Sequence, residues 1–137
     1  MLAISPKYKS LPYCSSEILF KFVNLKYNAA CFLDSSSIHK DYGRYSFIAF
    51  NPFMFFESNA KDVIIYDNNK KIIDKKNGSP FDILNAYLSK FKIKKIDGLP
   101  PFQGGACGYF GYEMLEHIED IDVPYNHMKT PDMAIGF

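Results

Sequence analysis

The chain has 137 residues, of which 47% are hydrophobic and 17% aromatic, and its 16 lysine and arginine residues against 15 aspartate and glutamate residues give a formal net charge of +1. This length suits one domain with a buried core, and the many phenylalanine and tyrosine residues are typical of a core with β-strands rather than of a disordered chain. The near-neutral charge argues against nucleic acid as a partner, and no apolar stretch approaches the roughly 20 residues that cross a membrane.

The N-terminal segment is predicted to be extended, because Pro6 and Pro12 each disfavour helix in the residue before them. It lacks the charged start and long apolar run of a signal peptide, so we expect a cytoplasmic protein. Cys14, Cys31 and Cys107 are widely spaced and form no Cys-x-x-Cys pair. We interpret them as buried thiols in a reducing compartment.

A helix is predicted from Ser15 or Ser16, which can cap it, to about Leu25. Its apolar residues recur at steps of three and four, which predicts a stripe that faces the core: Ile18, Leu19, Phe22, Val23 and Leu25. Three strands should follow, because apolar, aromatic and β-branched residues alternate with turn signals; they are expected at residues 29–33, 44–50 and 53–57.

Residues 62–66 and 71–74 predict a hairpin, because Asn68 and Asn69 between them tolerate the left-handed turn conformation. We expect this hairpin to be peripheral, with solvated lysines. Ser79 is predicted to cap a second helix with Pro80 at its first position. The lysines after that helix are interpreted as a solvated helix end rather than as an anion site.

Residues 100–113 place four glycines among aromatic rings, at positions 104, 105, 108 and 111. Neither the Walker spacing nor the dinucleotide-binding spacing fits these glycines, and no lysine follows any of them. The alternative is a strand whose glycines allow close backbone packing beneath Tyr109, Phe110 and Tyr112. We therefore predict that this segment is the central seam of the fold, followed by a short helix at residues 113–120 and a strand at 132–137.

His117 lies one helical turn after Glu113, a spacing that suits a metal site or a surface ion pair. No second pair of ligands is recognisable, which favours the ion pair. Cys107 has apolar, glycine-rich surroundings that give no reason for a reactive thiolate. Neither side chain can be named as a catalytic residue, and structural packing is the better interpretation of Cys107.

Polar side chains gather in residues 34–37 and again in residues 41–46. Hydroxyls and a carboxylate at a strand end, with Tyr42 and Arg44 in the following loop, could hold a small zwitterionic ligand. The alternative is purely structural, because Asp34 and Ser35 can also stabilise a turn while Arg44 pairs with Asp41. These residues alone do not decide between the two.

Four segments, in this order, resemble the N-terminal domain of the chorismate-utilising synthases: Phe32-Leu-Asp-Ser35, Gly43-Arg-Tyr-Ser-Phe-Ile48, Pro101-Phe-Gln-Gly-Gly-Ala-Cys-Gly-Tyr-Phe-Gly-Tyr-Glu113 and Pro131-Asp-Met-Ala134. The family includes component I of anthranilate synthase and of aminodeoxychorismate synthase. The anthranilate enzymes usually have Glu where Asp34 stands, so the resemblance favours the aminodeoxychorismate branch, which serves p-aminobenzoate and folate synthesis.

The resemblance implies an α+β fold, with antiparallel sheets packed against helices, and a single N-terminal domain at residues 1–137. It also implies that a C-terminal domain, absent here, binds chorismate and Mg²⁺, so the whole protein would be an enzyme and this fragment inactive. A glutamine amidotransferase subunit would supply ammonia to the whole enzyme.

The resemblance further implies a tryptophan-like pocket in this domain, regulatory in anthranilate synthases. By motif match its wall would include Ser35, Tyr42, Gly43, Arg44 and Tyr45. A function of another class remains open, namely a free-standing, non-enzymatic ligand-sensing module that uses the same pocket.

Overall fold

The computed structural model describes residues 6–35, 43–121 and 129–137. Its helices and antiparallel sheets confirm the predicted α+β class. By its internal contacts the chain divides into two compact units, residues 1–52 with 93–105 and residues 53–92 with 106–137. The single N-terminal domain stays a prediction, and each unit is taken by itself.

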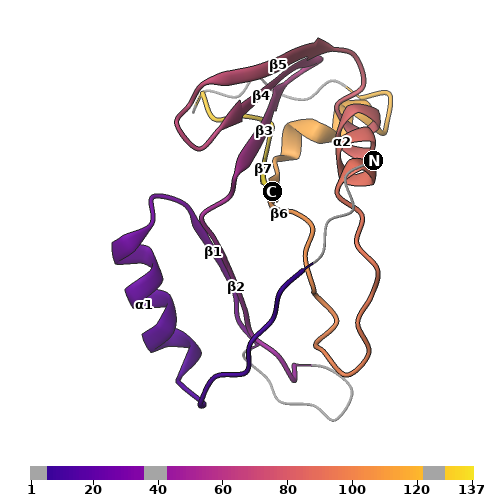
Figure 1. Ribbon diagram of the computed structural model, residues 1–137. Helices are drawn as coiled ribbons and strands as arrows, with labels where there is room; N and C mark the ends of the chain where they lie inside the picture. The colour runs from indigo at the N-terminus through magenta and orange to yellow at the C-terminus, as the bar shows by residue number, and fades with distance from the viewer. Residues whose placement is uncertain (1–5, 36–42, 122–128) are drawn as a thin grey trace. The chain divides into compact units, whose positions relative to one another are not determined.

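The described residues of the first unit include one helix beside one antiparallel pair of strands (Figure 1), and residues 93–105 add a segment without helix or strand. The helix α1 spans Ser16–Lys26, and it precedes the strands β1 (Ala30–Leu33) and β2 (Phe47–Phe50). The strands pair from Ala30 opposite Phe50 to Leu33 opposite Phe47. The ring of Phe20 on α1 stacks on that of Phe32 with 4.9 Å between centroids, which fixes the helix to the strand pair.

The apolar stripe predicted to face the core is largely exposed in α1. Phe22 is 67% exposed and Leu25 86% exposed, and Val23 alone among the stripe residues is buried. The helix contacts its strand pair through Phe20 instead. The prediction is wrong for most of the stripe, because two short strands offer too little surface to cover a whole apolar helix face.

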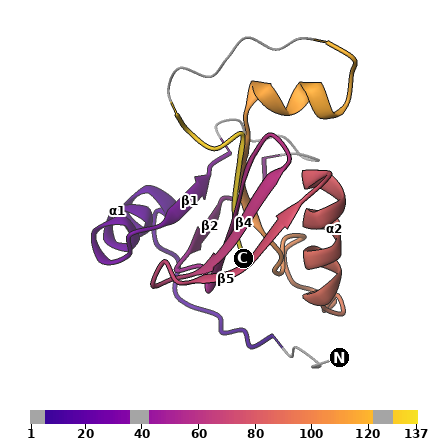
Figure 2. The same cartoon turned by 90° about the horizontal axis from the view of Figure 1, so that it is seen from above.

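The second unit is a five-stranded antiparallel sheet with strand order β5-β4-β3-β7-β6. Its strands are β3 (Met54–Asn59), β4 (Asp62–Asp67), β5 (Ile72–Asn77), β6 (Cys107–Phe110) and β7 (Met133–Gly136). The helix α2 (Pro80–Lys90) covers one face of the sheet (Figure 2). Alternate residues of β3 are buried between sheet and helix, among them Phe56, which is 0% exposed.

The start of α2 is confirmed. Ser79 is its N-cap, its Oγ accepts a hydrogen bond from the backbone N–H of Asp82 at 3.3 Å, and Pro80 is the first helical residue. Leu84 and Tyr87 on its inner face belong to the buried cluster. A hydroxyl cap followed by proline is a local signal for the start of a helix, which explains why this boundary could be predicted.

The predicted hairpin forms from β4 and β5, with two differences from the expectation. The left-handed residue in its turn is Lys70, with φ 63°, and neither of the two asparagines adopts a positive φ. The first strand is internal rather than peripheral, since Val63 and Ile65 are almost fully buried. Strand β5 forms one edge of the sheet and carries the solvated lysines.

The glycine-aromatic segment forms only the short strand β6, and it lies at an edge of the sheet rather than at the centre. Tyr109, Phe110 and Tyr112 are between 45% and 70% exposed, so the predicted central seam is wrong. The close backbone packing is nevertheless present at Gly108. An added Cβ there would lie 2.0 Å from the carbonyl oxygen of Ala134 on β7.

The strand predicted at residues 132–137 is β7, which lies between β3 and β6 inside the sheet. The short helix expected at 113–120 is a 3₁₀ helix, η1, over Tyr112–His117. In the segments that the structure describes, neither α-helix has the length and apolar character needed to cross a membrane.

Candidate functional site

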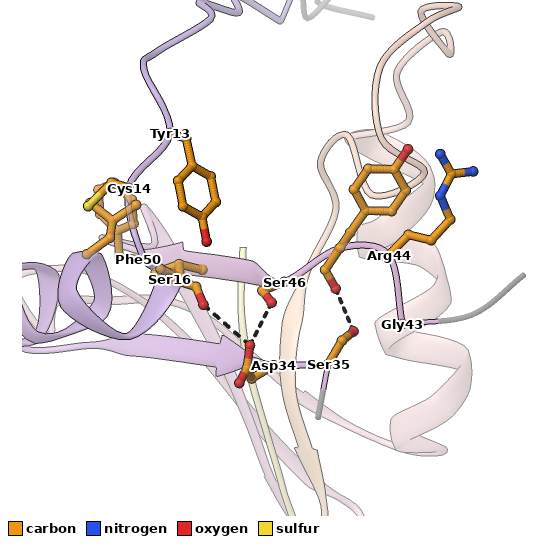
Figure 3. A pocket seen from close by; sticks show the side chains of 12 residues that line it. Tyr13, Cys14, Ser16, Asp34, Ser35, Gly43, Arg44, Ser46 and Phe50 are labelled. Carbon is orange, nitrogen blue, oxygen red and sulfur yellow. Dashed lines mark hydrogen bonds between the residues drawn. The ribbon is translucent and has the colours of Figure 1, made fainter. Parts of the chain in front are cut away.

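The candidate site is an open pocket of about 840 Å³ in the first unit, at the N-terminal end of α1 and alongside β1 and β2 (Figure 3). The chain brings three segments to it. Residues just before and within α1 form one side, the end of β1 supplies Asp34 and Ser35, and the segment entering β2 supplies residues 43–46. Figure 3 shows these side chains gathered from parts of the sequence that lie far apart.

Asp34 is held by two serine hydroxyls. Its Oδ1 accepts a hydrogen bond from Ser46 Oγ at 2.6 Å and a longer one from Ser16 Oγ at 3.5 Å (Figure 3). A carboxylate that accepts hydrogen bonds from two side chains is fixed in position. Asp34 therefore joins the start of α1 to the strand pair and places a carboxylate at the pocket wall.

Ser35 is hydrogen-bonded to the segment that enters β2. Its Oγ donates a hydrogen bond of 2.7 Å to the backbone carbonyl oxygen of Tyr45. The guanidinium of Arg44 lies 5.7 Å from the centre of the Tyr45 ring, within the range of a cation–π contact. A carboxylate and a guanidinium thus line one pocket, together with Ser35.

Four of the five residues predicted to form the pocket do line it, namely Ser35, Gly43, Arg44 and Tyr45. Tyr42 lies outside the described residues. Gly43 has a φ of 68°, which only glycine adopts without strain, so its place in the loop has a backbone reason. The ligand of the pocket stays a prediction, because lining a pocket is not binding.

Sequence reasoning missed the contribution of the N-terminal segment. Tyr13, Cys14 and Ser16 all line the pocket, although Ser16 was considered only as a helix cap and Cys14 only as a buried thiol. Cys14 is exposed, so that expectation is wrong for this residue, while Cys31 and Cys107 are half-buried. Nothing in the sequence links residues 13–16 to Asp34, because that contact depends on how α1 packs on the strands.

The region of His117 shows no ligand set. Among the residues that the structure describes, no group of three or more histidine, cysteine, aspartate and glutamate side chains could hold a metal ion. The Nε2 atom of His117 is buried without a hydrogen-bond partner, and its ring packs edge-on against Phe81 with 6.5 Å between centroids. Packing accounts for this residue better than the ion pair that the spacing favoured.

Among the described residues, those with clearly shifted pKa values all belong to the second unit. Burial raises the pKa of the Tyr66 hydroxyl, as does the hydrogen bond that it donates to Glu57. Burial likewise raises the pKa of Tyr109, with the negative charge of Glu57 adding to the effect. Tyr66 lies on strand β4 and Tyr109 on strand β6, and we interpret their hydroxyls as structural rather than catalytic groups.

Comparison with known proteins finds related sequences, although no protein-family model matches the chain. The chain is 35% identical to anthranilate synthase component 1 of Acetivibrio thermocellus over 85% of its own length, and 33% identical to that of Neisseria gonorrhoeae over 69%. It is 25% identical to aminodeoxychorismate synthase component 1 of Escherichia coli over 99% of its length. The chain spans 24%, 20% and 30% of these three relatives.

Proposed function

The chain belongs to the chorismate-utilising synthase family, and from this premise we propose that it is the N-terminal part of a longer enzyme that aminates chorismate. The relatives are three to five times as long as the region that matches, which supports a longer enzyme. The 137 residues by themselves would then be inactive, because the catalytic domain would lie in the rest of that enzyme.

The product that we propose is 4-amino-4-deoxychorismate, the precursor of p-aminobenzoate in folate synthesis. The observation that carries this choice is the aspartate at position 34, directly before Ser35. Its carboxylate lies 2.6 Å from Ser46 Oγ, and the longer side chain of a glutamate would displace it from that hydroxyl. The resemblance associates glutamate at this position with the anthranilate enzymes.

Anthranilate is the second candidate product, and sequence identity favours it. The relatives named anthranilate synthase reach 35% identity, against 25% for the one named aminodeoxychorismate synthase. Both reactions would start from chorismate and ammonia, so the two candidates differ in the product and in the pathway that it serves.

The remaining parts of the proposal lie outside these residues. We assign chorismate binding and Mg²⁺ to the missing part of the enzyme, because the described residues of this chain do not fit a metal site. A glutamine amidotransferase subunit would deliver ammonia, and the reaction would take place in the cytoplasm.

We propose that the pocket of the first unit binds an α-amino acid such as tryptophan, with Asp34 facing the ammonium group and Arg44 the carboxylate.

Genetic complementation with the full-length gene tests the choice of product. We expect the gene to restore growth of a p-aminobenzoate auxotroph and not of a tryptophan auxotroph. The reverse result would establish anthranilate as the product and overturn our choice. Rescue of neither strain, with the protein expressed alongside its amidotransferase, would contradict chorismate amination as a whole.

A further inference from the structure

The segment at residues 93–105, which belongs to the first unit, has a defined shape although it contains no helix or strand. The side-chain amide of Gln103 binds both backbone groups of Ile96. Its Oε1 accepts from the Ile96 N–H at 2.8 Å, and its Nε2 donates to the Ile96 carbonyl oxygen at 2.9 Å. This pair of bonds imitates the pairing of two strands and closes the loop between residues 96 and 103.

A second close approach holds the same loop next to Gln103. Gly104 has a φ of 146°, and an added Cβ there would lie 3.1 Å from Cδ1 of Ile93. The loop is thus held at residue 103 by hydrogen bonds and at residue 104 by close packing. Phe102 directly precedes these two anchored residues, which restricts where its ring can lie.

The ring of Phe102 contacts the strand pair beside the pocket. It meets Phe47, the first residue of β2, edge to face, with 5.6 Å between centroids and 80° between planes. Phe47 in turn contacts the ring of Tyr45 at 6.1 Å. Three aromatic rings therefore run in sequence from the closed loop to the pocket wall.

Tyr45 is where the polar groups of the pocket meet. Its carbonyl oxygen accepts the Ser35 hydroxyl at 2.7 Å, and its ring lies under the guanidinium of Arg44. The Tyr45 ring is 41% exposed, so the core does not hold it. A movement of this ring would disturb its contact with Arg44, whereas the bond to Ser35 depends on the backbone of the same residue.

We propose that Phe102, held by Gln103, is a positioning residue for this pocket, which it supports through Phe47 and Tyr45. The proposal rests on the amino-acid pocket of the proposed function. Phe102 touches no ligand in this account, and it is not among the residues that line the pocket. Its effect on a ligand passes entirely through the wall that it supports.

The test uses the full-length protein, with calorimetry of L-tryptophan binding and hydrogen-exchange mass spectrometry of residues 43–50 without ligand. We expect Phe102→Ala to weaken tryptophan binding about three- to tenfold, from the strength of one aromatic pair, and to speed exchange in residues 43–50. Gln103→Ala should act in the same direction. Phe102→Tyr should leave both the tryptophan affinity and the exchange rate of residues 43–50 at wild-type values, because it keeps the aromatic ring.

Phe110→Ala is the matched control, since Phe110 is also an exposed ring, at 55% against 39% for Phe102, with one stacked partner, Phe81, in the second unit. It should change neither measurement. Unchanged exchange in residues 43–50 after Phe102→Ala would overturn the positioning role, whatever the ligand. If the wild-type protein binds no tryptophan while Phe102→Ala still speeds this exchange, the positioning role stands and the ligand assignment of the pocket fails.

Discussion

Tyr87 and Asp74 form a hydrogen-bonded pair between α2 and the edge strand β5. The buried Tyr87 hydroxyl donates to Asp74 Oδ2 at 2.9 Å. Burial, helped by this bond to a carboxylate, raises the pKa of Tyr87 to about 12. The same bond is the main reason that the pKa of Asp74 is lowered, and Lys76, 3.3 Å away, adds to the effect.

These shifts predict the pH range in which the pair stabilises the fold. A lowered carboxyl pKa gives stability that is present above about pH 4 and is lost as the pH falls through the folded-state pKa of Asp74. A raised tyrosine pKa gives stability that is present below about pH 10 and is lost as the pH rises towards 12. The pair should therefore stabilise the protein over the whole neutral range.

Replacing Tyr87 with phenylalanine should lower the free energy of unfolding at neutral pH. The variant should also lose less of this stability than the wild type when the pH is made acidic or strongly alkaline. Urea unfolding midpoints measured from pH 2 to 7 and from pH 9 to 12 would check this. Tyr8→Phe is the control, because Tyr8 is largely exposed and its replacement should change neither slope. A Tyr87→Phe protein with the wild-type pH profile would show that the hydrogen bond does not contribute.

Substitutions at Ser35 and Arg44 test whether the pocket binds an amino acid. If an α-amino acid binds there, Arg44→Ala should weaken tryptophan binding to the full-length protein about ten- to a hundredfold, because a charge-assisted bond is lost. Ser35→Ala should weaken it about fivefold, since it loses only a neutral hydrogen bond. Calorimetry would measure both, and wild-type affinity in both variants would exclude the assignment.

Single residues differ in how well the sequence predicts their surroundings. Ser79 and Pro80 act within one turn of helix, so their roles could be read directly. Asp34 is bonded to Ser16 and Ser46, 18 and 12 residues away, and no local pattern encodes such contacts. The chemistry of residues 34–37 and 41–46 suggested a ligand site without deciding for it, and the family resemblance then supplied the residues of the pocket wall.

At the scale of elements, the prediction for β6 was correct about close backbone packing and wrong about the place of the strand in the sheet. Gly108 was expected to allow close backbone approach, and its missing Cβ does leave room for Ala134 of β7. The strand nevertheless lies at the sheet edge with exposed rings. A glycine in a strand indicates that a neighbouring backbone lies close on one side of that strand. It does not indicate whether a further strand pairs on the opposite side.

The variant Gly108→Val should destabilise the second unit by about 1–3 kcal/mol or more, because the new side chain would collide with the β7 backbone. Thermal melting and urea unfolding would measure the loss. Lys75→Val introduces the same side chain at an exposed position of β5 and should stay within about 0.5 kcal/mol of wild type. Equal stability of the two variants would refute tight packing at Gly108.

The residues that form helix α1 were predicted correctly, but the burial of its apolar stripe was not. Apolar spacing of three and four residues indicates a helix, and Ser16–Lys26 is one. The same spacing does not say how much surface the rest of the fold offers to cover it. Here the helix meets two strands of four residues each, and Phe22 and Leu25 stay exposed.

For the whole molecule, the two units differ in how much apolar surface they bury. The buried cluster, including Phe56, Ile65 and Met133, lies entirely in the second unit. In the described part of the first unit, Val23 is the one buried hydrophobic residue. Local stability follows buried contacts, so the units should open at different free energies.

Hydrogen exchange on the 137-residue chain should therefore show amides of β3, β4 and β7 exchanging much more slowly than those of β1 and β2. Mass spectrometry of peptides from each strand would measure the difference. Equal protection of all five strands would mean that the two units open together as one cooperative body.

Reading the gene beyond Phe137 addresses the remaining alternative for the whole protein. Several hundred further codons in frame would agree with the enzyme that we propose. A stop codon there would instead support the free-standing ligand-sensing module, whose pocket would be the same residues without a catalytic partner domain.

The sequence by itself determined the α+β class, the order of helices and strands, the start of α2 and, through four ordered motifs, the family. These features depend on residues near one another in the chain, or on motifs that can be compared directly. The tertiary structure alone decided that β6 lies at an edge, that most of the α1 stripe is exposed and that Tyr13 and Ser16 join the pocket. Each depends on which surfaces meet in space, and spacing along the chain does not specify that.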